Sequence, residues 1–211
     1  MVEYLDYADG PDALIDLPDY LLASAASTID IPQIHGAYLS PLETHGTHAL
    51  RALLSILGKK HREITSKDAS GVRRIDVTGH GLGAAMALLI SPPVAESTTH
   101  ALVHTTLFGL PRVGDRAFAD MIDHMDASSR VRIHRVTSYK DAVPHLPAEP
   151  TLIHPAKGQV WISSDPRVAY HCKAALGSNC GDDVKWAETS VFDHQGPYGG
   201  VWLGAQTCSQ A

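Results

Sequence analysis

Apolar side chains recur along the chain with the spacing of α-helices. Two sets occupy positions i, i+3, i+4 and i+7, the pattern of a helix with one buried face. They are Leu50, Leu53, Leu54 and Leu57, within a segment of about residues 40–58, and Phe118, Met121, Ile122 and Met125. A third helix, rich in small residues and leucine, is expected over Ala84–Ile90 and should end at Ser91-Pro92-Pro93, because proline has no amide hydrogen to donate.

Short apolar segments lie between these helices and predict β-strands. They are Arg74–Thr78, Ala101–Phe108, Val131–Val136 and Gln159–Ser163. Strands that alternate with helices predict an α/β fold with a mainly parallel sheet flanked by helices. The segment 138–150 holds three prolines and is expected to form an ordered loop.

Composition and charge limit the architecture and the partners. The 211 residues are 44% apolar, enough for one core of ordinary size, so a single domain over 1–211 is expected. The net charge of −6 is uneven, since residues 1–50 hold eight acidic residues and neither Lys nor Arg. We expect residues 1–12 to be a poorly ordered acidic leader. The concentrated basic surface that nucleic acid requires is absent from the sequence, which argues against that partner.

Cellular location is not fixed by the sequence. No run of 18 apolar residues is present, which argues against a transmembrane segment. Met1–Asp12 is acidic and interrupted, unlike the basic and then apolar start of a signal peptide. Cys172 and Cys180 enclose seven residues, which suits a small disulfide loop in an oxidising compartment. Cys208 is then either a lone thiol or the partner of a cysteine outside this sequence.

The most informative segment is Gly79-His80-Gly81-Leu82-Gly83, between a predicted strand and a predicted helix. A sharp strand-to-helix turn flanked by glycines is typical of a nucleophile elbow, which lifts its central residue to the edge of the sheet. The N–H of Leu82, at the helix N-terminus, can stabilise an oxyanion. A phosphate or dinucleotide turn is the alternative, but Thr98–Leu102 lacks the acidic residue that a dinucleotide site needs.

Two further residues complete a possible catalytic set. Asp141 follows the third predicted strand, and His194 lies near the C-terminus. The order of elbow, Asp141 and His194 is the nucleophile–acid–base order of α/β-hydrolases. Taken alone, Asp141 is more simply a turn residue and His194 a surface histidine. No third ligand accompanies the other histidines at a convincing spacing, so we expect no metal site.

At these positions the chain resembles the class 3 lipases, the fungal-lipase type of α/β-hydrolase. The matching stretches are Ile34–Tyr38, Val77–Ala85, Phe108–Phe118, Val136–Pro147 and Phe192–Tyr198. The resemblance implies that Asp141 is the triad acid, that His194 is the triad base and that Cys172 and Cys180 form a disulfide. It further implies hydrolysis of acylglycerol esters, or in some members feruloyl esters, without a cofactor. The partner is then an acyl ester or lipid-like small molecule, with possible contact to a lipid interface, and the family is mostly secreted.

Two departures from the family pattern bear on activity. Gly81 stands where the family has serine, and the first strands of the family fold are expected to be missing, with the Arg-Gly-Thr-like loop that supplies the second oxyanion donor. In the family a C-terminal cysteine such as Cys208 can pair with one near the start. Glycine has no side chain and cannot form an acyl-enzyme. Ser91 is ten residues further, about 15 Å along a helix, and is out of reach.

Three functions therefore stay open. The first is a class 3 lipase-like domain, impaired because the elbow serine is Gly81, in which only water activated by His194 is left as a slow nucleophile. The second is an active lipase or feruloyl-type esterase whose serine was lost by sequence error or mutation. The third is a module that binds lipid or a partner.

Overall fold

The computed structural model describes residues 34, 74–97, 101–127, 131–148, 151–172 and 180–203. Several predictions fall outside the described residues. They concern the helix at about 40–58, the acidic leader at 1–12, Cys208 and the missing first strands. No helix within the described ranges is long and apolar enough to cross a membrane.

Five strands form one sheet in the order in which they occur along the chain. They are β1 (Arg74–His80), β2 (Leu102–Phe108), β3 (Val131–Ser138), β4 (Gln159–Ile162) and β5 (Ala169–His171). β1 to β4 are parallel, and β5 pairs antiparallel with β4. The predicted mainly parallel sheet is confirmed. β5 was not predicted, because its three exposed residues carry neither an apolar run nor an alternation.

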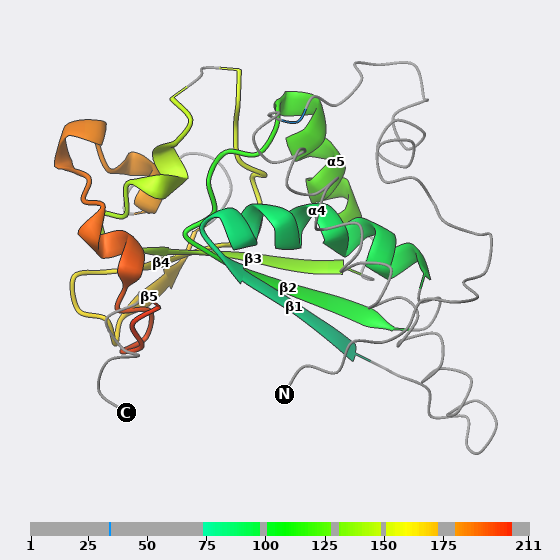
Figure 1. The fold of residues 1–211 in the computed structure, drawn as a ribbon, viewed down its shortest axis with the longest axis horizontal. Helices are drawn as coiled ribbons and strands as arrows, with labels where there is room; N and C mark the ends of the chain where they lie inside the picture. Colours follow the sequence, from blue (N-terminus) through cyan, green and yellow to red (C-terminus); the bar gives the residue numbers. More distant parts are fainter. Residues whose placement is uncertain are drawn as a thin grey trace, which may run out of the picture.

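Two helices cover the same face of this sheet, α4 (Leu82–Ser97) and α5 (Arg116–Ala127) (Figure 1). Alternate residues of the first three strands point toward them, and the core forms between these layers. On α5, Phe118 and Ile122 are each 1% exposed, which confirms the predicted helix and its apolar face. The helix begins after Asp115, whose side chain accepts the N–H of Phe118 at 2.9 Å, a typical N-cap.

The end predicted for the helix at Ser91-Pro92-Pro93 was wrong, because α4 continues through both prolines to Ser97. Proline lacks the N–H, but its fixed φ suits a helix. The Ser91 hydroxyl lies 2.6 Å from the carbonyl oxygen of Ala87 and 2.7 Å from the Thr105 hydroxyl on β2. Ser91 and Val94 are fully buried. Packing against the sheet therefore holds the last turns of α4 and makes Ser91 a structural residue.

Glycine at position 79 allows β1 and α4 to approach closely. A Cβ on Gly79 would overlap the backbone carbonyl of Gly83, in the first turn of α4. A Cβ on Gly83 itself would meet nothing within 4 Å. The two glycines therefore have different roles, although both flank the same turn.

We predict that Gly79→Ala destabilises the fold by about 1–3 kcal/mol, the usual cost of forcing an extra carbon into a packed site. Each kcal/mol corresponds to roughly 2–4 °C of Tm in a domain of this size. Gly83→Ala is the matched control and should leave the Tm unchanged or raise it, since alanine favours helix. Equal Tm values for the two variants in thermal unfolding would contradict this account of the turn.

Candidate active site

Gly81 forms the turn between β1 and α4 and has the backbone conformation expected of an elbow. Its φ of +56° is in the left-handed region, which strains residues that carry a Cβ. Its N–H donates to the carbonyl of Phe108 at 3.0 Å, and its own carbonyl accepts the N–H groups of Ala84 and Ala85. A Cβ placed on Gly81 would lie 2.8 Å from Nε2 of His194. Position 81 therefore faces the imidazole directly.

Asp141 and His194 form a hydrogen-bonded pair. His194 Nδ1 lies 3.0 Å and 3.1 Å from the two carboxylate oxygens of Asp141, which is 1% exposed. The carboxylate also accepts the N–H of Val143 at 2.9 Å and the hydroxyl of Tyr198 at 3.0 Å. Because a carboxylate only accepts, Nδ1 carries the proton and Nε2 of the neutral ring presents its lone pair toward Gly81.

Tyr198 is suited to remain a hydrogen-bond donor in this network. Burial, followed by the negative charge of Asp141, raises the pKa of the Tyr198 hydroxyl far above its ordinary value. The phenol therefore keeps its proton over the whole working range of pH. Its hydrogen bond to Asp141 helps to satisfy a carboxylate that has almost no contact with water.

Gly109, which follows β2, makes room for the Asp141–His194 pair. Its φ is +56°. A Cβ on Gly109 would lie 2.6 Å from Cε1 of His194 and 2.7 Å from both Nδ1 of His194 and Oδ2 of Asp141. These contacts are too short for carbon. A side chain at position 109 is thus incompatible with the observed hydrogen bond.

His80, the last residue of β1, supports the ring of His194. The two imidazole rings stack with their centroids 4.2 Å apart and an angle of 21° between their planes. His80 Nε2 lies 2.7 Å from the carbonyl oxygen of His194, and because a carbonyl only accepts, Nε2 is the donor. Burial is the main cause that lowers the pKa of His80, and the charge that His194 can carry lowers it further. A neutral His80 does not repel a protonated His194.

The segment that carries His194 runs along the loop that carries Asp141. Ser190 donates its N–H to the carbonyl of Lys140 at 2.7 Å and accepts the N–H of Ala142 at 3.3 Å. His194 follows in the 3-10 turn Phe192–Gln195. Backbone hydrogen bonds therefore hold the segments of Asp141 and His194 together, although 53 residues separate the two side chains.

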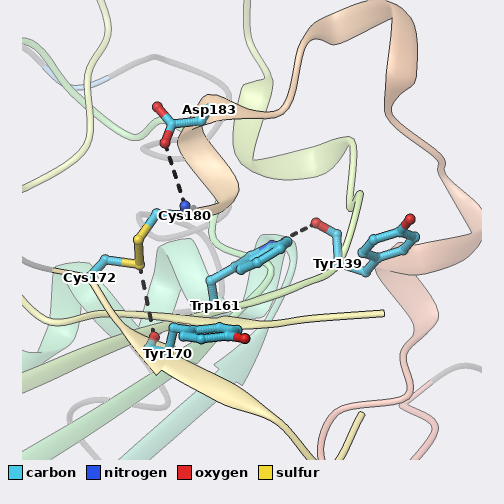
Figure 2. Close-up of a disulfide and its surroundings, with 6 residues drawn as sticks. All are labelled: Tyr139, Trp161, Tyr170, Cys172, Cys180 and Asp183. Carbon is cyan, nitrogen blue, oxygen red and sulfur yellow. Dashed lines mark hydrogen bonds between the residues drawn. A yellow bond between two sulfur atoms is a disulfide. The ribbon is translucent and has the colours of Figure 1, made fainter. Parts of the chain in front are cut away.

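A disulfide anchors the start of this segment to the edge of the sheet (Figure 2). Cys172 follows β5 and pairs with Cys180, with the Cα atoms 5.9 Å apart, as the resemblance implied. Gly181 is buried next, and a Cβ there would lie 2.9 Å from the Trp161 ring. The Trp161 N–H in turn donates to the carbonyl of Tyr139, two residues before Asp141, at 2.8 Å. Gly181, directly after the disulfide, thus lies close to the indole ring that holds the loop before Asp141.

Leu82, the proposed oxyanion donor, begins α4. Its side chain is 52% exposed. Within the described part of the chain, its N–H has no hydrogen-bond acceptor, as expected in the first turn of a helix. Among the described residues, no acceptor therefore competes with a ligand for this group.

Several apolar side chains are exposed on the segments that form the site. Those exposed on the segments that carry Gly81, Asp141 and His194 are Leu82, Leu146, Trp186, Val191, Phe192, Val201, Trp202 and Leu203. The rings of Phe192 and Trp202 lie 5.4 Å apart. Across the described ranges, no three His, Cys, Asp or Glu side chains are grouped so that they could hold a metal ion.

The structure pairs Asp141 with His194 and places the imidazole beside position 81, with Leu82 next in the chain. Sequence reasoning assigned no role to three residues of this site, His80, Gly109 and Tyr198. Each carries a weak signal, since His80 precedes the elbow residue, Gly109 directly follows a strand and Tyr198 lies four residues after His194. None of these signals predicts which residue is contacted, because the contacts with Asp141 and His194 join segments that are distant in the sequence.

Comparison with known proteins relates the chain to lipases. The family model of class 3 lipases matches residues 10–151. A secreted mono- and diacylglycerol lipase of Malassezia globosa is 38% identical over 96 residues, 46% of this chain and 31% of that protein. A lipase of Rhizomucor miehei is 29% identical over 166 residues, 73% of this chain and 44% of that protein. The chain thus spans less than half the length of these curated relatives.

A solved structure is similar in fold. It is described as a triacylglycerol lipase whose catalytic centre is formed by a serine protease triad. The match has a TM-score of 0.60 at 25% identity and covers 82% of this chain and 62% of that one. The α/β-hydrolase fold expected from the sequence is confirmed.

We predict that Gly109→Ala breaks the hydrogen bond between Asp141 and His194, because the methyl group would occupy the space of both side chains. The low-field proton signal of an imidazole bound to a carboxylate should be present in the parent NMR spectrum and lost in the variant. Gly199→Ala is the matched control. Gly199 has a similar φ of +59° but nothing within 4 Å of a Cβ, so both variants bear about 1–3 kcal/mol of backbone strain. Loss of the signal in both variants, or in neither, would refute the role of Gly109.

We also predict that His80 makes the fold less stable in acid. Its pKa in the folded chain lies below its ordinary value, so the unfolded chain binds the proton first as pH falls below about 6.5. The stability that neutral His80 contributes is present at neutral pH and is lost progressively as the pH falls below about 6.5, until the folded chain also takes up the proton. In urea unfolding between about pH 7 and 5, His80→Gln should lose less stability than the parent. An equal loss in both proteins would argue against a neutral, partly buried His80.

Proposed function

Because the chain belongs to the class 3 lipase family, we propose that it is an ester-hydrolase domain that has kept the acid–base pair of its triad and lost nucleophilic catalysis through its side chain. The observation that carries this proposal is the 2.8 Å between a Cβ built on Gly81 and Nε2 of His194. A Cβ at this distance requires the His194 ring to shift, and with that shift a serine at position 81 would have its hydroxyl beside the base. Glycine supplies no oxygen, so no acyl-enzyme forms there.

Each residue of the site has a role in this proposal. Gly81 occupies the nucleophile position, His194 is the general base and Asp141 fixes its tautomer and stabilises its protonated form. The Leu82 N–H is one oxyanion donor, at the start of a helix whose dipole favours negative charge. Two supporting features are the hydrogen-bonded geometry of the pair and the resemblance to relatives described as lipases.

The substrate class is an acyl ester with an apolar acyl chain. Exposed apolar side chains, among them Val191, Phe192 and Trp202, lie on the segment that carries His194 and support contact with such a chain or with a lipid surface. The same apolar side chains also favour a second candidate function, binding of a lipid without turnover. The two candidate functions differ in whether a bound ester is hydrolysed with His194 as the base.

Restoring the hydroxyl tests the proposal. Gly81→Ser should hydrolyse p-nitrophenyl butyrate at least about 10²-fold faster than Gly81→Ala, a small part of the roughly 10⁶-fold that the catalytic serine contributes in a serine protease. Gly81→Ala is the matched control, because both variants add a Cβ at φ +56° and a contact with the His194 ring. His194→Ala in the Gly81→Ser background should abolish the gain.

Two outcomes would contradict the proposal. If Gly81→Ser is no faster than Gly81→Ala while both fold, the acid–base pair is not arranged for catalysis, and lipid binding becomes the better account. If the parent itself shows a burst of p-nitrophenol that survives in Gly81→Ala, the nucleophile is a different residue.

A further inference from the structure

We propose that the Asp141–His194 pair activates a water molecule in place of a serine, so that the chain hydrolyses activated acyl esters in one step without an acyl-enzyme. This inference rests on the proposed function, since it assigns the same base a different nucleophile. It goes beyond that function because it predicts an activity for the chain as it stands, with glycine at position 81.

The orientation of His194 supplies the base. Nδ1 is committed to Asp141, which leaves the lone pair of Nε2 directed toward Gly81. The imidazole is 18% exposed, so solvent reaches it, whereas Asp141 is closed to solvent. A general base acts on a nucleophile within about 2.6–3.2 Å of its nitrogen, a distance at which water can lie beside Nε2.

The absence of a side chain at position 81 leaves room for a water molecule beside Nε2 of His194. A Cβ there would be 2.8 Å from Nε2 and 3.3 Å from Cε1, and so would fill the approach to the lone pair. Glycine leaves this approach open, and a water can contact Nε2 and the Cα hydrogens of Gly81 together. A methyl group at position 81 would overlap a water in that place.

The reaction balances with water as the only co-reactant. The water oxygen forms a bond to the ester carbonyl carbon while Nε2 takes one of its protons, and the carbonyl π electrons move to oxygen. We assign the Leu82 N–H as a donor to this oxyanion, and Asp141 stabilises the imidazolium. Collapse breaks the bond to the leaving oxygen, which receives the proton from Nε2. The products are a carboxylic acid and an alcohol or phenol, and the base is regenerated.

The chemistry of the leaving group sets the substrate class. Water is a weaker nucleophile than an activated serine, and no covalent intermediate divides the barrier into two smaller ones. Esters with acidic leaving groups, such as aryl esters, need little help from the imidazolium when the carbon–oxygen bond breaks. We therefore assign aryl esters of short acyl chains as the substrates that this site hydrolyses.

Parent, His194→Ala and Gly81→Ala are compared on p-nitrophenyl acetate and phenyl acetate. General-base catalysis accelerates reactions by about 10²–10⁴-fold, so the parent should hydrolyse p-nitrophenyl acetate about 10²-fold faster than His194→Ala. His194→Ala retains the other twelve of the 13 histidines and so corrects for hydrolysis by exposed imidazoles. Gly81→Ala should fall to the level of His194→Ala, with folding checked by circular dichroism.

The time course of p-nitrophenol release distinguishes direct attack by water from a mechanism with an acyl-enzyme. With the parent, p-nitrophenol should appear without a burst at enzyme concentrations near those of substrate, and turnover should depend on the leaving group. A parent rate equal to that of His194→Ala, or a burst in the parent, would overturn the inference. If the parent is inactive while Gly81→Ser is active, this inference fails and the proposed function stands. If Gly81→Ser is also inactive, the proposed function fails.

Discussion

The site depends on one interaction, the hydrogen bond between the buried carboxylate of Asp141 and Nδ1 of His194. A carboxylate with 1% exposure is stable only when its oxygens are satisfied, and Val143, Tyr198 and His194 all donate to it. This arrangement fixes the tautomer of the imidazole and so decides which nitrogen faces the elbow. It also requires that nothing larger than glycine stands at position 109.

The rest of the described fold holds these two side chains in place. The parallel strands end at one edge, where β1 delivers His80 and Gly81 and the loop after β3 delivers Asp141. The last segment is fixed at its start by the Cys172–Cys180 disulfide, and it brings His194 back to that edge. In the function that we propose, the turn, the helix N-terminus and the base are all present at this elbow, and the attacking oxygen of a serine is not.

Patterns that depend on local periodicity were predictable from the sequence. The first three strands, α5 and the α/β class all follow from apolar spacing, and the order of Asp141 and His194 after the elbow indicated which residues meet. The predicted end of α4 was wrong, because burial of Ser91 and Val94 outweighs the local effect of two prolines. β5 gives no apolar signal at all. The contributions of His80, Gly109 and Tyr198 could not be foreseen, because each depends on a contact whose geometry the fold alone creates.

Covalent labelling tests the central claim most directly. Each protein is treated with an alkyl fluorophosphonate, which bonds to the nucleophile of a serine hydrolase, and the modified residue is identified by mass spectrometry. The account predicts no label on the parent, a single label on the new serine of Gly81→Ser, and no label when His194→Ala is added. A labelled residue in the parent, or an unlabelled Gly81→Ser protein that is correctly folded, would contradict the view that the acid–base pair is in place and that the attacking oxygen at position 81 is missing.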